Sequence, residues 1–235
     1  MFPRIARIGL PAALACAIPS PYSMAEGGER MHAERIEFSE SFEDGWRDRW
    51  QERRLAYRAT RYGTVREGDD QVLRADSRGA ASGLWREAAL HAPRSGRVAW
   101  RWRVDRGIEA RVDEREKSGD DFAARLFVVF GGEFPSRDNR ALCYVWAAGE
   151  PAGSVYRSPY ADQVAMIVVA SGGAGTGEWR SVERDFIADY RAVFGEEPLD
   201  LSGVALMVDT DNTGSEVRTF FDDVTLEADG TRPSR

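Results

Sequence analysis

Apolar residues alternate with polar or charged residues at a period of two along most of the chain. In the run 98–104, valine or tryptophan occupies every even position, while Arg101 and Arg103 stand between them. Further runs of this kind, bounded by Gly, Pro, Asp or Asn, fall at 142–146, 164–169, 204–208 and 220–226. A period of two is the spacing of a β-strand, so these runs predict strands.

One run differs because it is apolar on both faces, as expected for a central strand between packed layers. It covers residues 122–130. A single segment predicts a helix: the spacing of its apolar residues near 187–194 fits one helix face, and Gly195 follows as a stop. Many strands with one short helix predict an all-β fold, a two-sheet antiparallel β-sandwich of jelly-roll type.

The N-terminus has the pattern of a secretory signal. Arg4 and Arg7 precede the uncharged stretch 8–18, and small residues stand at 23 and 25, the positions that a signal peptidase reads. We expect cleavage after Ala25 and a periplasmic product without a transmembrane segment, because the apolar stretch is too short to span a bilayer. A lipoprotein attached through Cys16 is the less favoured alternative, since Ala13 is a poor residue for that signal.

These signals divide the chain into four parts. They are a signal peptide at 1–25, a linker at 26–33, a β-sandwich domain at 34–228 and a disordered tail at 229–235.

Charge and residue usage exclude several functions. The formal net charge is −7, which opposes binding of nucleic acid or anionic lipid through a general basic field. Cys143 is the single cysteine of the mature chain, and its strand-like surroundings indicate a buried core residue. The chain has two histidines, His32 and His91, so a Ser-His-Asp site is not expected.

The two ends of the domain resemble the opening and closing strands of jelly-roll carbohydrate-binding modules. The start reads FEDGW at 42–46 and the end reads FFDDVTL at 220–226. The resemblance implies that the terminal strands lie side by side and that acids there hold a structural calcium. Glu43 and Asp222 are the candidate metal ligands. In the alternative, Asp222 accepts hydrogen bonds without a metal.

Two internal segments resemble the signature of a family of exported bacterial proteins known only as a domain of unknown function. They are GDDFAAR at 119–125 and DTDNT at 209–213. The segments around Trp100, Tyr144 and Tyr160 also fit that family. This resemblance implies a fold and an exported location, and it implies no activity.

Acidic residues flank two of the predicted central strands. Asp120 and Asp121 precede 122–130, and Asp209 and Asp211 follow 204–208. If these strands are antiparallel neighbours, the four carboxylates meet at one end of the sandwich. Arg125 would then have to neutralise part of their charge, or one carboxylate would keep its proton near neutral pH. Clusters of this kind shift pKa values and often mark function, so these four aspartates are the candidate catalytic residues. Acid–arginine pairs that only hold the sheet together are the alternative.

Seven tryptophans favour a ligand with sugar rings, because aromatic faces stack on the apolar faces of sugars. We therefore favour an exported protein that binds a saccharide or another cell-envelope polymer. An enzyme acting on polysaccharide through the acidic cluster, and a scaffold protein of the envelope, are the alternatives, because jelly rolls host all three. The candidate ligand-binding residues are Arg125, Arg140, Tyr144, Trp146, Tyr160 and Trp179.

Overall fold

The computed structural model of the chain describes residues 31–109, 112–132, 138–172 and 177–233. The predicted signal peptide at 1–25 and the first part of the predicted linker lie outside these residues. The strands are β1 (Met31–Glu40), β2 (Gln51–Arg54), β3 (Arg61–Glu67), β4 (Asp70–Arg78), β5 (Ala81–Arg106), β6 (Ala124–Phe130), β7 (Arg140–Ala147), β8 (Val155–Ser158), β9 (Ala161–Ser171), β10 (Arg180–Asp185), β11 (Leu201–Asp209) and β12 (Glu216–Pro233). The helices are α1 (Trp46–Arg49), a 3-10 turn (Lys117–Gly119) and α2 (Phe186–Phe194).

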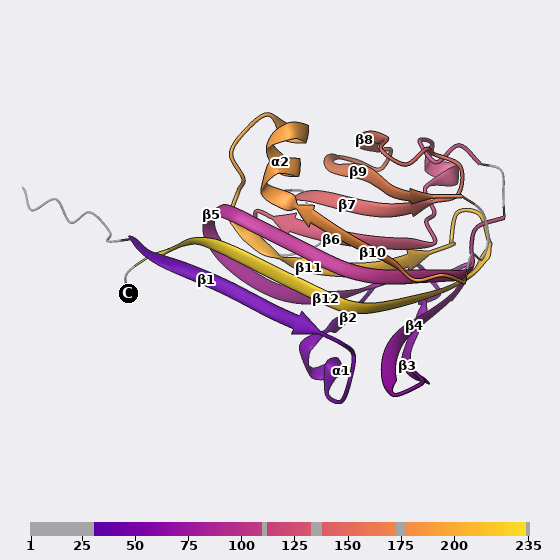
Figure 1. Cartoon of the computed structure of the whole chain (residues 1–235). Helices are drawn as coiled ribbons and strands as arrows, with labels where there is room; N and C mark the ends of the chain where they lie inside the picture. Colours follow the sequence, from indigo (N-terminus) through magenta and orange to yellow (C-terminus); the bar gives the residue numbers. More distant parts are fainter. Residues whose placement is uncertain (1–30, 110–111, 133–137, 173–176, 234–235) are drawn as a thin grey trace, which may run out of the picture.

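The strands form two layers that pack face to face (Figure 1). Sheet A has the order β3-β4-β12-β5-β10, with β1 against the second half of β12. Sheet B has the order β2-β5-β11-β6-β7-β9-β8. Among the described strands every pair is antiparallel except β7 and β9, which are parallel. The predicted two-sheet β-sandwich is confirmed.

Strand β5 belongs to both sheets. Leu90 is its last residue paired with β11 of sheet B, and His91 is the first paired with β12 of sheet A. The chain changes layer directly afterwards, where Ala92 has a φ of 42° and Pro93 follows. Proline lacks a backbone N–H and suits a break in strand pairing. One strand therefore fixes the two layers relative to each other.

Large aromatic side chains fill the space between the sheets. Trp100 and Trp102 of β5 contact Tyr144 and Trp146 of β7, with ring centroids 5.4 and 6.0 Å apart for the pairs Trp100–Tyr144 and Trp102–Trp146. All four side chains are buried. The alternation that predicted strands therefore also places these rings at the centre of the core.

Helix α2 closes one end of this core, and the predicted helix is confirmed within one residue. The Asp185 side chain accepts a hydrogen bond from the backbone N–H of Ala188 at 2.8 Å, which caps the helix start. On the buried side, the ring of Tyr190 lies 4.7 Å from that of Phe130.

The two termini of the domain differ from expectation. The sequence predicts a linker up to 33 and a disordered tail from 229, but β1 begins at Met31 and β12 continues to Pro233, and these segments pair with each other. Strands pair through backbone groups and do not need apolar side chains. Because the residues at both ends of the domain are mostly polar, their hydrophobicity pattern does not predict these strands. The terminal strands lie side by side, as the resemblance to carbohydrate-binding modules implies.

A glycine in β5 gives a test of this packing. A Cβ atom on Gly96 would lie 2.1 Å from Cζ of the fully buried Phe186, the first residue of α2. Gly96→Ala should therefore lower the free energy of unfolding by about 1–3 kcal/mol through overpacking. Gly63→Ala in β3 is the control, because nothing lies within 4 Å of its added Cβ. Urea unfolding that finds the two variants equally stable would contradict the docking of α2.

Candidate functional site

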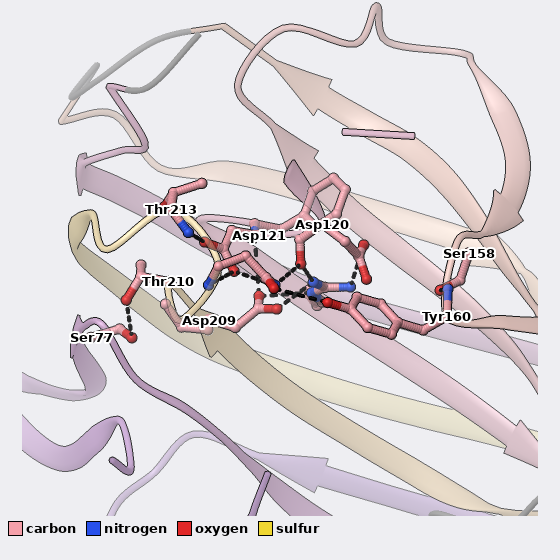
Figure 2. Close-up of polar contacts among 12 residues, drawn as sticks. Ser77, Asp120, Asp121, Ser158, Tyr160, Asp209, Thr210 and Thr213 are labelled. Carbon is pink, nitrogen blue, oxygen red and sulfur yellow. Dashed lines mark hydrogen bonds and ion pairs between the residues drawn. The ribbon is translucent and has the colours of Figure 1, made fainter. Parts of the chain in front are cut away.

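The four candidate aspartates meet at one end of sheet B, as the sequence predicts. Figure 2 shows Asp120, Asp121 and Asp209 beside one another there. Strands β6 and β11 are antiparallel neighbours, with Arg125 opposite Met207. This pairing brings the carboxylates that precede β6 to those that follow β11. Side-chain oxygens of Asp121, Asp209 and Asp211 lie within 4.8 Å of one another, so this group could hold a metal ion.

Arg125 lies at the centre of the cluster. Its guanidinium donates to both carboxylate oxygens of Asp209, with an Nε–Oδ1 distance of 2.8 Å. The same guanidinium donates to the backbone carbonyl of Asp120 at 2.7 Å. Asp209 also accepts the backbone N–H of Phe122 at 3.1 Å. Arginine thus joins β6, the end of β11 and the segment before β6 through charge-assisted hydrogen bonds.

Asp121 holds the turn that follows β11. Its carboxylate accepts the backbone N–H of Thr213 at 2.6 Å and the side-chain amide of Asn212 at 3.1 Å. Tyr160, in the turn between β8 and β9, donates to the side-chain oxygen of Asn212 at 2.9 Å (Figure 2). The turn is therefore fixed from two sides.

Burial dominates the electrostatics of the cluster. Asp120, Asp121 and Asp209 are 5, 0 and 2% exposed, and only Asp211 is open to solvent. Burial raises the pKa of Asp209 to about 7, while the Arg125 guanidinium acts in the opposite direction. Burial also raises the pKa of Asp120 and of Asp211. The arrangement is a nearly closed ionic network, which matches the structural alternative for these residues.

The second pair of predicted metal ligands lies elsewhere. Asp222 of β12 is buried and contacts the guanidinium of Arg101 on the neighbouring β5. Glu43 accepts the backbone N–H of Gln71 at 3.0 Å and its side-chain amide at 3.1 Å. These contacts fit the alternative in which Asp222 accepts hydrogen bonds, because a guanidinium already neutralises it. Calcium prefers six to eight oxygen ligands without a cation among them.

Three of the candidate ligand-binding residues are buried. Tyr144 and Trp146 point into the core between the sheets, and Arg125 belongs to the acidic cluster. Residues 141–147 of β7 are buried on both faces, so the sequence alone could not decide which face turns inward.

The other three lie at separate places on the surface. Arg140 pairs with Glu196, and Tyr160 is 56% exposed beside the acidic cluster. Trp179 lies on the outer face of sheet A, where its ring contacts the guanidinium groups of Arg101 and Arg103. The structure does not bring the six candidate ligand-binding residues together in one site.

A groove that the sequence analysis did not identify opens on the outer face of sheet B. Its volume is about 1080 Å³, and it lies at the end of β6 and β11 opposite to the acidic cluster. Trp85 of β5 forms part of its wall. We call it the Trp85 groove; its polar lining side chains are Gln51, Arg53, Glu87, Asp200 and Ser202.

The place of Trp85 is set by a glycine on the next strand. A Cβ atom on Gly203 would lie 2.7 Å from the Trp85 ring and 2.3 Å from the backbone oxygen of Arg86. The signal in the sequence is weak, because Trp85 stands in a short alternating run and its partners in the groove are far away along the chain.

The Arg125–Asp209 contact gives a prediction for stability. Arg125→Met leaves the Asp209 carboxylate buried without its charged partner, which should lower the free energy of unfolding by about 3–5 kcal/mol at neutral pH. The double variant Arg125→Met/Asp209→Asn removes the charge as well, and it should be more stable than the single variant. Urea unfolding measures both.

The contribution of Asp209 to the free energy of unfolding depends on pH, and the sign of this dependence follows from its pKa. Folding raises the pKa of Asp209 from 3.8 to about 7. Between these values the folded chain holds a proton that the unfolded chain has lost, so the contribution of Asp209 to stability falls as the pH rises. Without the Arg125 guanidinium the pKa of Asp209 rises further, so the stability lost through Arg125→Met should shrink as the pH is lowered from 7 towards 5, where the folded Asp209 is protonated in both proteins. A deficit that is constant with pH, and equal in both variants, would contradict the ion pair.

Several solved structures are similar to this chain. The family 11 carbohydrate-binding module from Clostridium thermocellum, in complex with a beta-1,3-1,4-mixed-linked tetrasaccharide, is 7% identical with a TM-score of 0.41, covering 80% of this chain and 94% of that one. The cellulose induced protein Cip1 is 8% identical with a TM-score of 0.47, covering 80% and 96%. The CBM22-1 xylan-binding domain from Paenibacillus barcinonensis Xyn10C is 12% identical with a TM-score of 0.39, covering 81% and 92%.

Sequence comparison gives a family. No curated protein matches the chain. Separately from these comparisons, the described residues contain no helix with the length and apolar character needed to cross a membrane. The model of one family, described as "Protein of unknown function (DUF3047)", matches residues 48–225, a segment that includes the acidic cluster and Trp85. The chain therefore belongs to the family of proteins of unknown function called DUF3047.

Proposed function

We propose that this domain binds a saccharide in the Trp85 groove. The observation that carries the proposal is a set of hydrogen-bonding side chains around one open groove, which the indole of Trp85, 6% exposed, borders. Sugar rings offer apolar C–H faces and a rim of hydroxyl groups, so they are recognised by an aromatic ring together with polar partners. The volume of about 1080 Å³ accommodates several sugar units.

The polar groups are placed to meet a ligand. Gln51 and Glu87 are exposed and stand on neighbouring strands, since Gln51 of β2 pairs with Trp85 of β5. On the other side of the groove, Asp200 accepts the backbone N–H of Ala92 at 3.0 Å and contacts His91 at 2.8 Å. Asp200 is therefore held in position by the bend of β5.

We favour a role in binding over an enzyme that uses the carboxylates of the acidic cluster. A glycoside hydrolase needs two carboxylates that reach the scissile bond from opposite sides. Asp120, Asp121 and Asp209 are at most 5% exposed, and Arg125 or backbone N–H groups occupy their oxygens. The cluster also lies at the opposite end of β6 and β11 from the groove.

Export and calcium are separate parts of the proposal. The predicted signal peptide, which lies outside the described residues, motivates a cell-envelope saccharide as the ligand. Calcium binding stays a prediction; the Asp121, Asp209 and Asp211 group is the place where several carboxylates could hold a metal ion.

The test is binding to a glycan array, followed by calorimetry with the oligosaccharide that binds. Gln51→Ala/Glu87→Ala should weaken affinity by about tenfold or more through the loss of hydrogen bonds to sugar hydroxyls. Gln163→Ala/Glu183→Ala is the matched control, because neither residue lines the groove, and it should bind like the unmodified protein. Trp85→Phe keeps a ring in place and should reduce affinity less than the double variant.

Two outcomes would count against this function. Equal affinities of the groove variant and the control would remove the groove as the binding site. Release of new reducing ends from the bound saccharide, abolished by Asp209→Asn, would favour the enzyme alternative.

A further inference from the structure

A second groove lies on the other side of strand β2 and is rich in arginine. Alternate residues of a strand point to opposite sides. Gln51 and Arg53 line the Trp85 groove, while Glu52 and Arg54 line this second groove. Its volume is about 920 Å³, and residues of α1, β3, β4, β12 and the segment 57–60 complete it.

The charge of this groove is opposite to that of the chain. Six arginines face three carboxylates, an excess of three positive charges in a protein with a formal net charge of −7. We call it the arginine groove; its arginines are Arg47, Arg54, Arg58, Arg61, Arg78 and Arg218. Arg218 is paired with Asp76 at 2.8 Å.

Four of these arginines have no acidic partner. In the described part of the chain, no carboxylate lies within ion-pair distance of Arg54, Arg58, Arg61 or Arg78, which are all exposed. Some exposed arginines elsewhere have an acidic partner, as Arg97 has Glu183 at 2.6 Å, whereas Arg66, Arg94 and Arg157 have none among the described residues. The groove differs in that four unpaired guanidinium groups line one hollow, where an anion can contact several of them together.

An aromatic ring stands at the edge of the same groove. Tyr57 is 95% exposed, an unusual position for a large ring. The backbone around it is fixed, because the N–H groups of Leu55 and Ala56 donate to the oxygen of Ala81 at 3.2 Å and Ala81 donates back to Arg58 at 3.0 Å. Tyr57 is therefore presented to solvent by a segment that is paired on both sides of it.

We propose that the arginine groove binds an acidic oligosaccharide, with carboxylate or sulfate groups on successive sugar units. Guanidinium groups bind carboxylate and sulfate through paired hydrogen bonds, and the Tyr57 ring offers a stacking surface for a sugar. The negative charge of the whole protein disfavours a long phosphate backbone, so a short acidic saccharide fits better than a nucleic acid. The residues differ from those of the Trp85 groove, and this inference does not depend on that groove binding a saccharide.

The test is calorimetry with four probes at low and at high salt. Trigalacturonate carries carboxylates and a heparin-derived tetrasaccharide carries sulfates, while cellotriose is uncharged and a single-stranded oligonucleotide represents the other class of polyanion. At least one acidic oligosaccharide should bind, and its affinity should fall as salt rises. The probe that binds more tightly identifies the anion.

Two variants assign the binding to this groove. Arg58→Ala/Arg78→Ala should weaken affinity for the acidic oligosaccharide by about tenfold or more, through the loss of two charged hydrogen-bond donors. Arg94→Ala/Arg97→Ala is the matched control, because it removes the same charge from exposed residues outside the groove, and it should bind as before. Tyr57→Ala should also weaken binding, and its melting temperature should not change because the ring is exposed.

Three results would overturn the proposal. They are the absence of binding by both acidic oligosaccharides, equal affinities of the groove variant and its control, and tighter binding of the oligonucleotide through the same arginines. Cellotriose tests the Trp85 groove instead: its binding should be weakened by Gln51→Ala/Glu87→Ala and kept in Arg58→Ala/Arg78→Ala, so the two proposals fail separately.

Discussion

The arrangement of the two central strands of sheet B, β6 and β11, depends on the buried contact between Arg125 and Asp209. A charge in this position is costly without its partner, because burial removes the water that would stabilise it. The guanidinium also binds the backbone of Asp120, so the segment before β6 is fastened to the end of β11. The register of these two central strands, and hence the shape of the surface at their far ends, is tied to this pair.

That geometry separates a closed end of the sheet from an open one. At the closed end, the carboxylates accept hydrogen bonds from Arg125 and from backbone N–H groups. At the open end, the pairing of β11 with β5 shifts register between Leu201 and Gly203, and the Trp85 groove forms there. The side chains of β2 alternate between two grooves: Gln51 and Arg53 line the Trp85 groove, and Glu52 and Arg54 line the arginine groove. A groove with two acids and one arginine, and a groove rich in arginine, can thus arise from one edge strand.

The fold and the acidic cluster could be predicted from the sequence, but the two grooves could not. The period of two predicts the strands, and the position of Asp120 and Asp209 at opposite ends of two central runs predicts their meeting. The inward turn of Tyr144 and Trp146 was not predictable, since β7 is apolar on both faces. The Trp85 groove joins residues near 51, 85 and 200, and only the strand order brings them together. Pairing of β1 with the end of β12 depends on backbone groups, which leave no pattern in the side chains.

We infer that the Arg125–Asp209 pair keeps the acidic cluster closed while a ligand binds at the other end of the strands. A crystal structure of the protein with its bound saccharide, grown in the presence of calcium, tests it most directly. We expect saccharide density in the Trp85 groove, with Arg125 still in contact with both oxygens of Asp209. Saccharide or metal density between Asp121 and Asp209, with Arg125 displaced from the carboxylate, would contradict it.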